Sequence, residues 1–395
     1  MNLIATVLAF FVVGVFAWPS AACAADVSGP ARPTLGGFDL SLSVLGAVGG
    51  SSANDRELEF LQAGGHDPGR NGFNLQNVEL TLAGTVDRYF DAQANIIFLI
   101  DRHGDSVVEL EEAFLATRAL PAGLQLKAGY FYTEFGRHNP QHPHSWVFVD
   151  QPVVLSRFLG PDGLRNPGAR LSWLMPLPWY SEWYLGAQDA GGETAVSFLW
   201  EPGESVGGNV LIDRGGARGL TDLLRSARWL NGFDVSDTVS VNLGLSALAG
   251  PNASGDDTDT RIYGVDVYLK WKPLLNQRGF PFLAWQTELL RRDYQIPAGT
   301  LKDGGGYSQL LWGYAPGWVA GARAEYADAK GETEDDPLRD RRTRASANLT
   351  WHMSEYSKLR LQYNHDRAEQ LADGRAHSLW LQYEVGFGKH AAHLF

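Results

Sequence analysis

The chain has 395 residues, a formal net charge of -12 and one cysteine, Cys23, so disulfide bonds cannot organise its fold. An acidic balance of this size argues against a nucleic-acid partner. The 45 glycines and the 12% aromatic content suit many tight turns and interfacial rings, whereas three methionines are few for helical packing.

The N-terminus carries the one long apolar run, from Leu3 to Trp18. It is followed by Ala22-Cys23-Ala24, a small-x-small pattern that predicts a cleaved signal peptide over residues 1–24. The run has no Lys or Arg before it, but the amino group of Met1 supplies one positive charge. Cys23 could instead be a lipoprotein cysteine, although Ser20-Ala21-Ala22 lacks the expected leucine.

The mature chain, 25–395, has no apolar stretch near the roughly 20 residues that a membrane helix needs. If it meets a membrane, it must therefore cross as a closed barrel. Residues 25–36, rich in Pro, Gly and Ala, are expected to be a periplasmic lead-in to that single domain.

Apolar and polar residues alternate along segments of about ten residues, as strands with one lipid face and one wet face require. From Tyr263 to Trp271 the odd positions are apolar or aromatic, whereas Asp266 and Lys270 share the other face; a helix would mix these sets. This pattern predicts sixteen strands: 38–48, 74–86, 87–101, 106–118, 122–135, 167–176, 180–190, 220–232, 237–249, 259–273, 279–293, 304–314, 316–328, 341–353, 356–368 and 375–387.

Aromatic residues close several of these segments, among them Trp271, Tyr326 and Trp351. Their apolar bodies and polar tips suit the headgroup level, so they are predicted to form aromatic girdles.

The predicted connections alternate between short turns and long loops. The long ones are 49–73, 136–166, 191–219, 250–258, 294–303 and 329–340, which is typical of short periplasmic turns and long external loops. The final residue, Phe395, is of the aromatic type that the barrel-assembly machinery reads. The predicted fold class is an all-β transmembrane antiparallel barrel of about 16 strands in the bacterial outer membrane, in contact with its lipid and lipopolysaccharide.

A barrel of this width cannot be filled by its own inward side chains, so water occupies it and conduction is the expected function. The third long loop, 136–166, is expected to fold inward and narrow the bore. Its charged and histidine residues are the candidate constriction: Arg137, His138, His142, His144, Asp150 and Arg157.

Three histidines lie within seven residues of this loop, stiffened by Pro140 and Pro143. Imidazole nitrogens suit zinc, copper or nickel, so His138, His142 and His144 form a candidate metal site with zinc as the candidate cofactor. The spacing is not a specific metal signature. The same histidines could line a polar constriction, bond to the loop backbone or face water.

The inferred lumen face carries both signs of charge and no dense arginine ladder, so at best weak charge selectivity is expected. Acidic loop segments such as 255–257 and 332–336 are interpreted as solvated surfaces. The predicted lumen residues are Lys127, Arg170, Lys270, Arg292, Arg323, Arg360, Asp266, Glu288, Glu325 and Glu384.

The chain resembles the phosphate-selective porin superfamily, sixteen-stranded barrels of Gram-negative bacteria that usually assemble as trimers. The likeness to a group labelled zinc-regulated or TonB-dependent receptors rests on 126–131, 135–139 and 142–144, which read LKAGYF, FGRHN and HPH. The resemblance implies the barrel and a homotrimer. A TonB-dependent receptor has a plug domain and about twenty-two strands, which would not fit this length, so energised uptake is not implied. Phosphate selectivity is not implied either, because the inferred lumen residues include no arginine ladder.

Two other functions compete with that of a passive porin. An outer-membrane lipase or protease would need a nucleophile and base, but the sequence has no Gly-x-Ser-x-Gly elbow. A metal-linked uptake or binding protein would use the loop histidines to capture zinc.

Overall fold

The computed structural model describes residues 34–35, 37–214, 219–330, 336 and 339–388. The predicted signal peptide, the start of the lead-in and the terminal Phe395 lie outside the described residues. A short strand, β1 (Thr34–Leu35), pairs with β2 at the beginning of the described chain.

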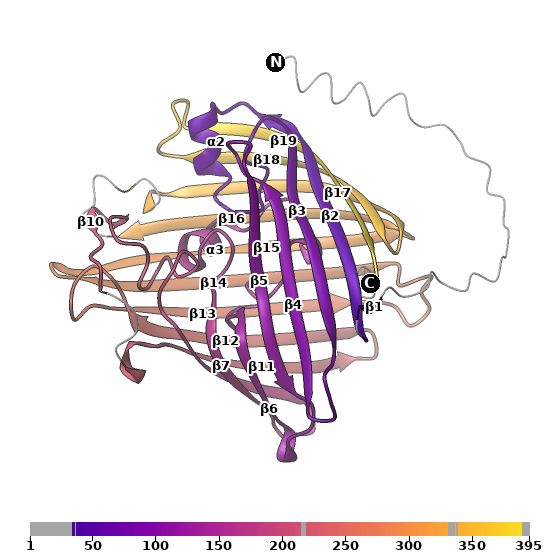
Figure 1. The fold of residues 1–395 in the computed structure, drawn as a ribbon. Coiled ribbons are helices and arrows are strands. Elements are labelled where there is room, and N and C mark those ends of the chain that lie inside the picture. The colour runs from indigo at the N-terminus through magenta and orange to yellow at the C-terminus, as the bar shows by residue number, and fades with distance from the viewer. Residues whose placement is uncertain (1–33, 36, 215–218, 331–335, 337–338, 389–395) are drawn as a thin grey trace.

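Within the described chain, sixteen antiparallel strands form one closed sheet in which each strand pairs with its neighbour and the last, β19, pairs with β2 (Figure 1). The all-β fold class is therefore confirmed. The strands are β2 (Phe38–Ser51), β3 (Gly72–Thr85), β4 (Phe90–Ile100), β5 (Ser106–Thr117), β6 (Leu124–Tyr132), β7 (Arg165–Leu174), β8 (Tyr180–Gln188), β11 (Leu224–Ser236), β12 (Val239–Pro251), β13 (Asp259–Trp271), β14 (Phe282–Ile296), β15 (Gly299–Ala315), β16 (Trp318–Lys330), β17 (Arg342–Ser354), β18 (Ser357–Ala368) and β19 (Arg375–Phe387).

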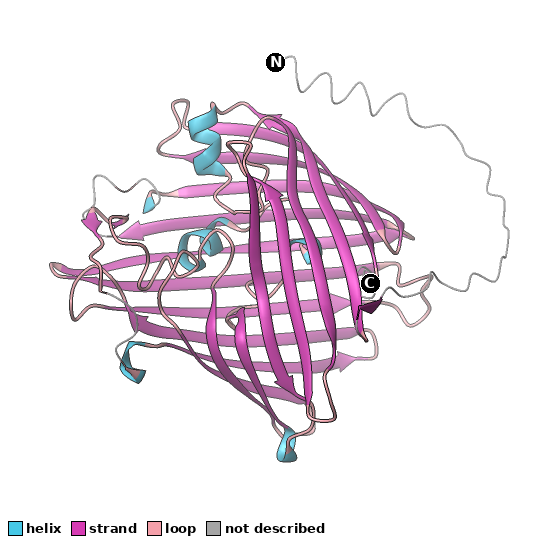
Figure 2. Cartoon of the chain, viewed as in Figure 1, coloured by secondary structure: helices cyan, strands magenta, loops and turns pink. Residues whose placement is uncertain are grey.

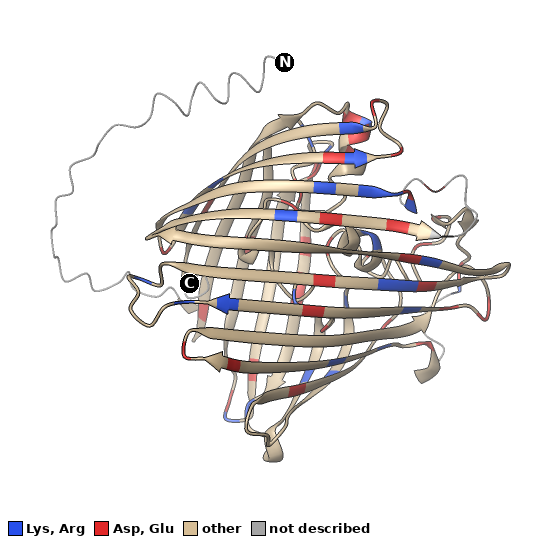
Figure 3. Cartoon of the chain, turned by 180° about the vertical axis from the view of Figure 1, so that it is seen from behind, with Lys and Arg blue, Asp and Glu red and all other residues tan. Residues whose placement is uncertain are grey.

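The alternation read from the sequence sorts side chains to the two faces of this sheet. In β13, Tyr263 and Val265 are 47% and 48% exposed on the outside, whereas Asp266 is 2% exposed inside. Tyr326 and Trp351, both predicted for the aromatic girdles, also lie exposed on the outer surface. Charged residues consequently form isolated bands on strands that are otherwise uncharged (Figure 3).

The alternation of short turns and long loops is confirmed for most of the chain, with two corrections. The connection 272–281 between β13 and β14 lies on the side of the short turns but is longer than the external loop 252–258. The predicted loop 294–303 does not exist, because β14 and β15 continue through it and pair as far as Ile296 and Gly299. Tyr294 and Leu301, neighbours in this extension, are buried in an apolar cluster inside the barrel mouth. That burial makes extended strands more favourable than an open loop.

Among the described residues, helices occur only in short pieces between the strands (Figure 2). The α-helices are α2 (Asp55–Leu61), whose N-terminus is closed by a capping box of Asn54 and Glu57, and α3 (Val153–Leu159). Single 3-10 turns are η1 (Pro121–Gly123), η2 (Pro143–Ser145) and η3 (Leu220–Asp222), and a small hairpin joins β9 (Ser205–Val206) to β10 (Asn209–Val210). No helix in the described chain has the length and apolar character to cross a membrane.

Two loops fill the external mouth of the barrel. We call residues 133–164, between β6 and β7, loop L3, and residues 189–223, between β8 and β11, loop L4. Phe158 and Leu159 of L3 and Phe198 of L4 share the largest apolar cluster with inward residues of the strands. The predicted inward fold of the third long loop is therefore confirmed, and Figure 1 shows α3 inside the ring of strands.

Candidate functional site

Loop L3 crosses the bore and bonds to inward side chains of several strands. The Gly136 N–H donates to Ser246 Oγ at 3.1 Å, and the His138 N–H donates to Glu288 Oε1 at 2.9 Å. Further along, the Val153 N–H donates to Glu325 Oε2 at 2.7 Å. These bonds join L3 to β12, β14 and β16, so L3 is positioned by the barrel wall.

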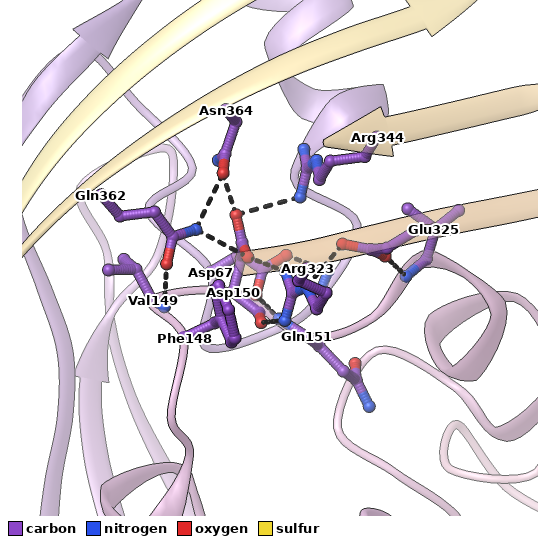
Figure 4. A network of polar contacts seen from close by, with 12 residues as sticks. Asp67, Phe148, Val149, Asp150, Gln151, Arg323, Glu325, Arg344, Gln362 and Asn364 are labelled. Carbon is purple, nitrogen blue, oxygen red and sulfur yellow. Dashed lines mark hydrogen bonds and ion pairs between the residues drawn. The ribbon is translucent and has the colours of Figure 1, made fainter. Parts of the chain in front are cut away.

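Asp150, one of the predicted constriction residues, lies at the centre of the contact between loop L3 and the inner wall of the barrel (Figure 4). Its fully buried carboxylate pairs with Arg323 and with Arg344 at 3.0 Å, and it accepts from Gln362 at 3.0 Å and Asn364 at 2.8 Å. Burial alone would raise the pKa of Asp150, but Arg344 and Arg323 outweigh it and lower the pKa to about 2.

The wall that faces Asp150 is rich in basic side chains. Arg342 and Arg344 on β17 share Asp366, each at 2.9 Å, and Arg360 donates to the carbonyls of Trp146 and Phe148 in L3. The expectation of a lumen without concentrated arginine was wrong for this wall. In the sequence, four arginines crowd residues 339–344, and Arg342 and Arg344 share the parity that faces inward on β17.

The part of the wall formed by β3 and β5 is acidic. Glu79 on β3 and the neighbours Glu111 and Glu112 on β5 are all buried. Glu111 and Glu112 both reach the lumen because β5 has a bulge: Asn95 pairs with Glu112 and Ile96 with Leu110, which leaves Glu111 as the extra residue.

The acidic wall holds two of the loop histidines. His142 Nε2 lies 2.9 Å from Glu112 and its Nδ1 lies 2.6 Å from Glu111, whereas His144 Nδ1 lies 2.8 Å from Glu79. Sequence reasoning missed these three glutamates. The signal for two of them was present, since consecutive acids at 111 and 112 break the period-two pattern of their strand.

The three predicted metal-site histidines do not form one group. His142 and His144 stack with ring centroids 5.7 Å apart. His138 instead packs against Trp146 at 5.1 Å and Tyr307 at 6.2 Å. Burial, and then the charge of Arg323, lower the pKa of His138 to about 3, so its imidazole is neutral at ordinary pH.

Arg157, the last of the predicted constriction residues, lies on α3 and donates to the carbonyl of Asp340 at 2.7 Å. It borders a cavity of about 560 Å³ at the loop end of the barrel, between α2, α3 and loop L4. Basic and aromatic side chains share that lining, among them Arg56, Arg102, Phe60, Phe158 and Trp200.

All ten predicted lumen residues are buried or half-buried, and most are neutralised by a neighbour. Asp266 pairs with Arg228 at 2.6 Å, and Arg292 with Asp303 at 2.6 Å. Further pairs join Arg170 to Glu134, Arg323 to Glu325 and Lys358 to Glu384.

Several inward cations differ from this pattern: Lys127, Lys270 and Arg137, the first of the predicted constriction residues, and also Arg157 and the buried Arg360. Within the part of the chain that the structure describes, none of them forms an ion pair. The guanidinium of Arg137 lies 3.8 Å from the ring centre of Tyr268, and the Lys270 ammonium lies 5.4 Å from that of Phe282. These groups leave a modest positive excess on the half-buried part of the inner wall.

Comparison with known proteins gives one relative by sequence. No protein-family model matches the chain. An uncharacterised protein of Aquifex aeolicus is 32% identical over 392 residues, a match that covers 90% of this chain and 80% of that protein.

Solved structures give a consistent likeness in fold. The outer-membrane channel DcaP of Acinetobacter baumannii is 13% identical, with a TM-score of 0.59 over 90% of this chain and 100% of that one. The anion-selective porin of Comamonas acidovorans is 8% identical, with a TM-score of 0.56 over 89% and 99%. The outer-membrane protein OmpT of Vibrio cholerae, in its trimer form, is 8% identical, with a TM-score of 0.54 over 89% and 99%.

Proposed function

We propose that this chain is a porin for passive diffusion of small polar solutes or ions. The chain belongs to the same family as the Aquifex aeolicus protein, and it is a barrel of the bacterial outer membrane. The observation that carries the proposal is a closed sixteen-stranded barrel whose inner wall is polar and whose third long loop folds inward. A sheet of this circumference is too wide to be filled by its own side chains, so water enters the remaining bore.

Weak charge selectivity is part of the proposal. Most inward charges are neutralised by a partner within the wall, so they present little net field to a passing ion. The half-buried cations Lys127, Arg137 and Lys270, which form no ion pair in the described chain, favour anions slightly.

Single-channel recording in planar bilayers tests both parts. Purified protein should produce stepwise conductance, with a reversal potential in a salt gradient that is close to zero and shifted slightly in the anion direction. The triple variant K127Q/R137Q/K270Q should shift it toward cations. The matched control is Arg291→Gln, since Arg291 is exposed on the outer surface and pairs there with Asp293.

Absence of pores from folded protein would overturn the channel, and an unchanged reversal potential in the triple variant would overturn the proposed source of selectivity.

Export through residues 1–24, insertion by the barrel-assembly machinery, contact with lipopolysaccharide and a homotrimer belong to the same proposal. The Vibrio cholerae protein of similar fold was solved in a trimer form, which supports the trimer. Chemical cross-linking in intact outer membranes should give a band at three times the chain mass.

The two alternative functions, a barrel hydrolase and a metal-uptake protein, are less well supported. The structures of similar fold that are described as channels or porins favour conduction over hydrolysis. None of these comparisons supports metal uptake. Metal binding by the loop is a separate question, which the side-chain geometry addresses directly.

A further inference from the structure

Five side chains join loop L3 to the acidic wall, and we call them the His/Glu cluster: Glu79, Glu111, Glu112, His142 and His144. Glu79 Oε1, Glu111 Oε2 and His142 Nδ1 converge so that they all lie within 4.8 Å of one another. His142 Nδ1 is 3.2 Å from the Glu79 oxygen and 2.6 Å from the Glu111 oxygen. Ligand atoms around one metal ion lie about 3 Å apart, because each lies about 2 Å from the ion. The contact with Glu79 has this spacing, whereas the contact with Glu111 is the shorter one of a direct ion pair that a metal would open.

Hydrogen bonds from neighbouring residues orient the three carboxylates of the cluster toward the loop histidines. Tyr132 donates its hydroxyl to Glu111 Oε1 at 2.6 Å and its backbone N–H to Glu112 Oε1 at 3.1 Å, so the other oxygen of each glutamate turns toward His142. Asn95 donates to Glu79 Oε1 at 2.7 Å. Outer partners of this kind orient the ligands of metal sites.

Two atoms of the cluster need a positive centre between them. Glu111 Oε2 and His142 Nδ1 are buried and lie 2.6 Å apart as an ion pair, and Glu79 Oε1 lies 3.2 Å from the same nitrogen. Glu111 itself is fully buried. A buried carboxylate oxygen and an imidazole nitrogen this close are costly unless a proton or a metal ion lies between them.

The charge of the cluster leads to the same conclusion. Three buried carboxylates meet two imidazoles, which are neutral when they act as metal ligands. Lys127 is near Glu112, but its ammonium lies 3.9 Å from the ring centre of Phe114 and forms no ion pair within the described chain. A divalent ion would reduce the formal charge of the cluster from three negative to one negative.

We propose that the His/Glu cluster binds one divalent first-row transition-metal ion, which fastens loop L3 to β3 and β5. Imidazole together with carboxylate and no thiolate suits zinc or its neighbours in that row, whereas calcium and magnesium prefer oxygen alone. The ion would hold the loop in place inside the bore. The site does not depend on whether the barrel conducts.

The competing explanation is that both imidazoles are protonated and pair with the glutamates without a metal. Burial alone would lower the pKa of His142, but Glu111 and Glu79 raise it well above the ordinary value, so charged imidazole is the state that a metal must displace. A binding measurement separates the two explanations, because a cluster that is stable only as protonated ion pairs would show no tight zinc site.

Calorimetric titration of the chelator-treated full chain in detergent with zinc chloride should show one tight site per chain. Glu111→Gln keeps the shape of the side chain and its acceptor for Tyr132, yet it should weaken zinc binding by at least about tenfold, as should His142→Gln. His138→Gln is the matched control, since it alters a histidine of the same loop outside the cluster and should leave the affinity unchanged.

Copper(II) provides a second probe that reports on the ligands themselves. Its electron paramagnetic resonance spectrum should show coupling to the His142 nitrogen in the wild type. His144→Gln keeps Glu79, Glu111 and His142 and should retain this coupling, whereas His142→Gln should lose it. The wild type alone tests the site even if one of the variants does not fold.

The absence of a tight zinc site in the folded wild type, or equal affinity in wild type, Glu111→Gln and His142→Gln, would overturn the proposal. Calorimetry in detergent requires no pore, so a protein that binds zinc and does not conduct would refute the channel alone.

Discussion

At the scale of single residues, Asp150 shows how one loop carboxylate positions a whole segment. Four side chains from three strands converge on it: Arg323 from β16, Arg344 from β17, and Gln362 and Asn364 from β18 (Figure 4). A depressed pKa means that this contribution to stability is complete above the ordinary value of 3.8 and is lost as the pH falls toward about 2. Loop L3 should thus stay docked at neutral and mildly acidic pH.

Asp150→Ala should release the loop, because it removes the carboxylate through which Arg323 and Arg344 hold L3, and these arginines keep only their wall partners Glu325 and Asp366. Since each arginine retains one carboxylate, the cost should lie below the roughly 3–5 kcal/mol of a fully broken buried pair. Limited proteolysis of the folded barrel should then cut within 133–164 much faster than in the wild type. Asp150→Asn keeps the size of the side chain and some of its hydrogen bonds, so its cleavage rate should be intermediate. Equal cleavage rates for the wild type and both variants would show that Asp150 does not hold L3.

At the scale of single elements, the bulge in β5 decides the chemistry of the acidic wall. A regular strand would turn Glu111 toward lipid, but the extra residue turns both Glu111 and Glu112 toward His142. Since Glu111 has no pairing partner on β4, the sheet does not need it for its register.

Deleting Glu111 should therefore leave a folded barrel with a regular β5. Circular dichroism and heat-modifiable migration on gels should match the wild type, while zinc affinity falls as it does in Glu111→Gln. The control is deletion of Val265 in β13, where pairing is unbroken on both sides. That deletion moves one end of the strand to the wrong face, so it should abolish folding. Failure of both deletions to fold would show that the bulge is required.

At the scale of the whole molecule, the outer and inner faces of the barrel require side chains of opposite polarity. The outer face is apolar and meets lipid, whereas the inner face pairs its charges or gives them to loop L3. The apolar cluster of L3 and L4 lies inside the external mouth, so much of the core is made by loops rather than by strands.

Val265→Arg should destabilise the barrel in lipid vesicles, because it places a charge near the middle of an outward strand face. The expected loss is about 2–4 kcal/mol in the free energy of unfolding, measured by urea titration. Asp257→Arg, on the exposed loop between β12 and β13, should change it little. Equal effects of the two substitutions would contradict the lipid-facing assignment of β13.

The sequence by itself determined the strands and their faces. The boundaries of β19 at Arg375 and Phe387 were predicted as observed, and Asp266 was placed inside and Tyr263 outside. This is possible because alternation is local: each side chain faces lipid or the bore according to its parity along the strand. The inward course of the third long loop followed from its length and its polar residues.

Only the tertiary structure decided which residues meet. Closure of the barrel brings β3 and β5 against the first part of loop L3 and β16 to β18 against Asp150, so His142 meets Glu111 while Asp150 meets Arg344. The continuous hairpin at Ile296 and Gly299 and the separation of His138 from the other histidines depend on the same packing. Register and closure join positions far apart in the chain, and a period-two pattern contains no information about such partners.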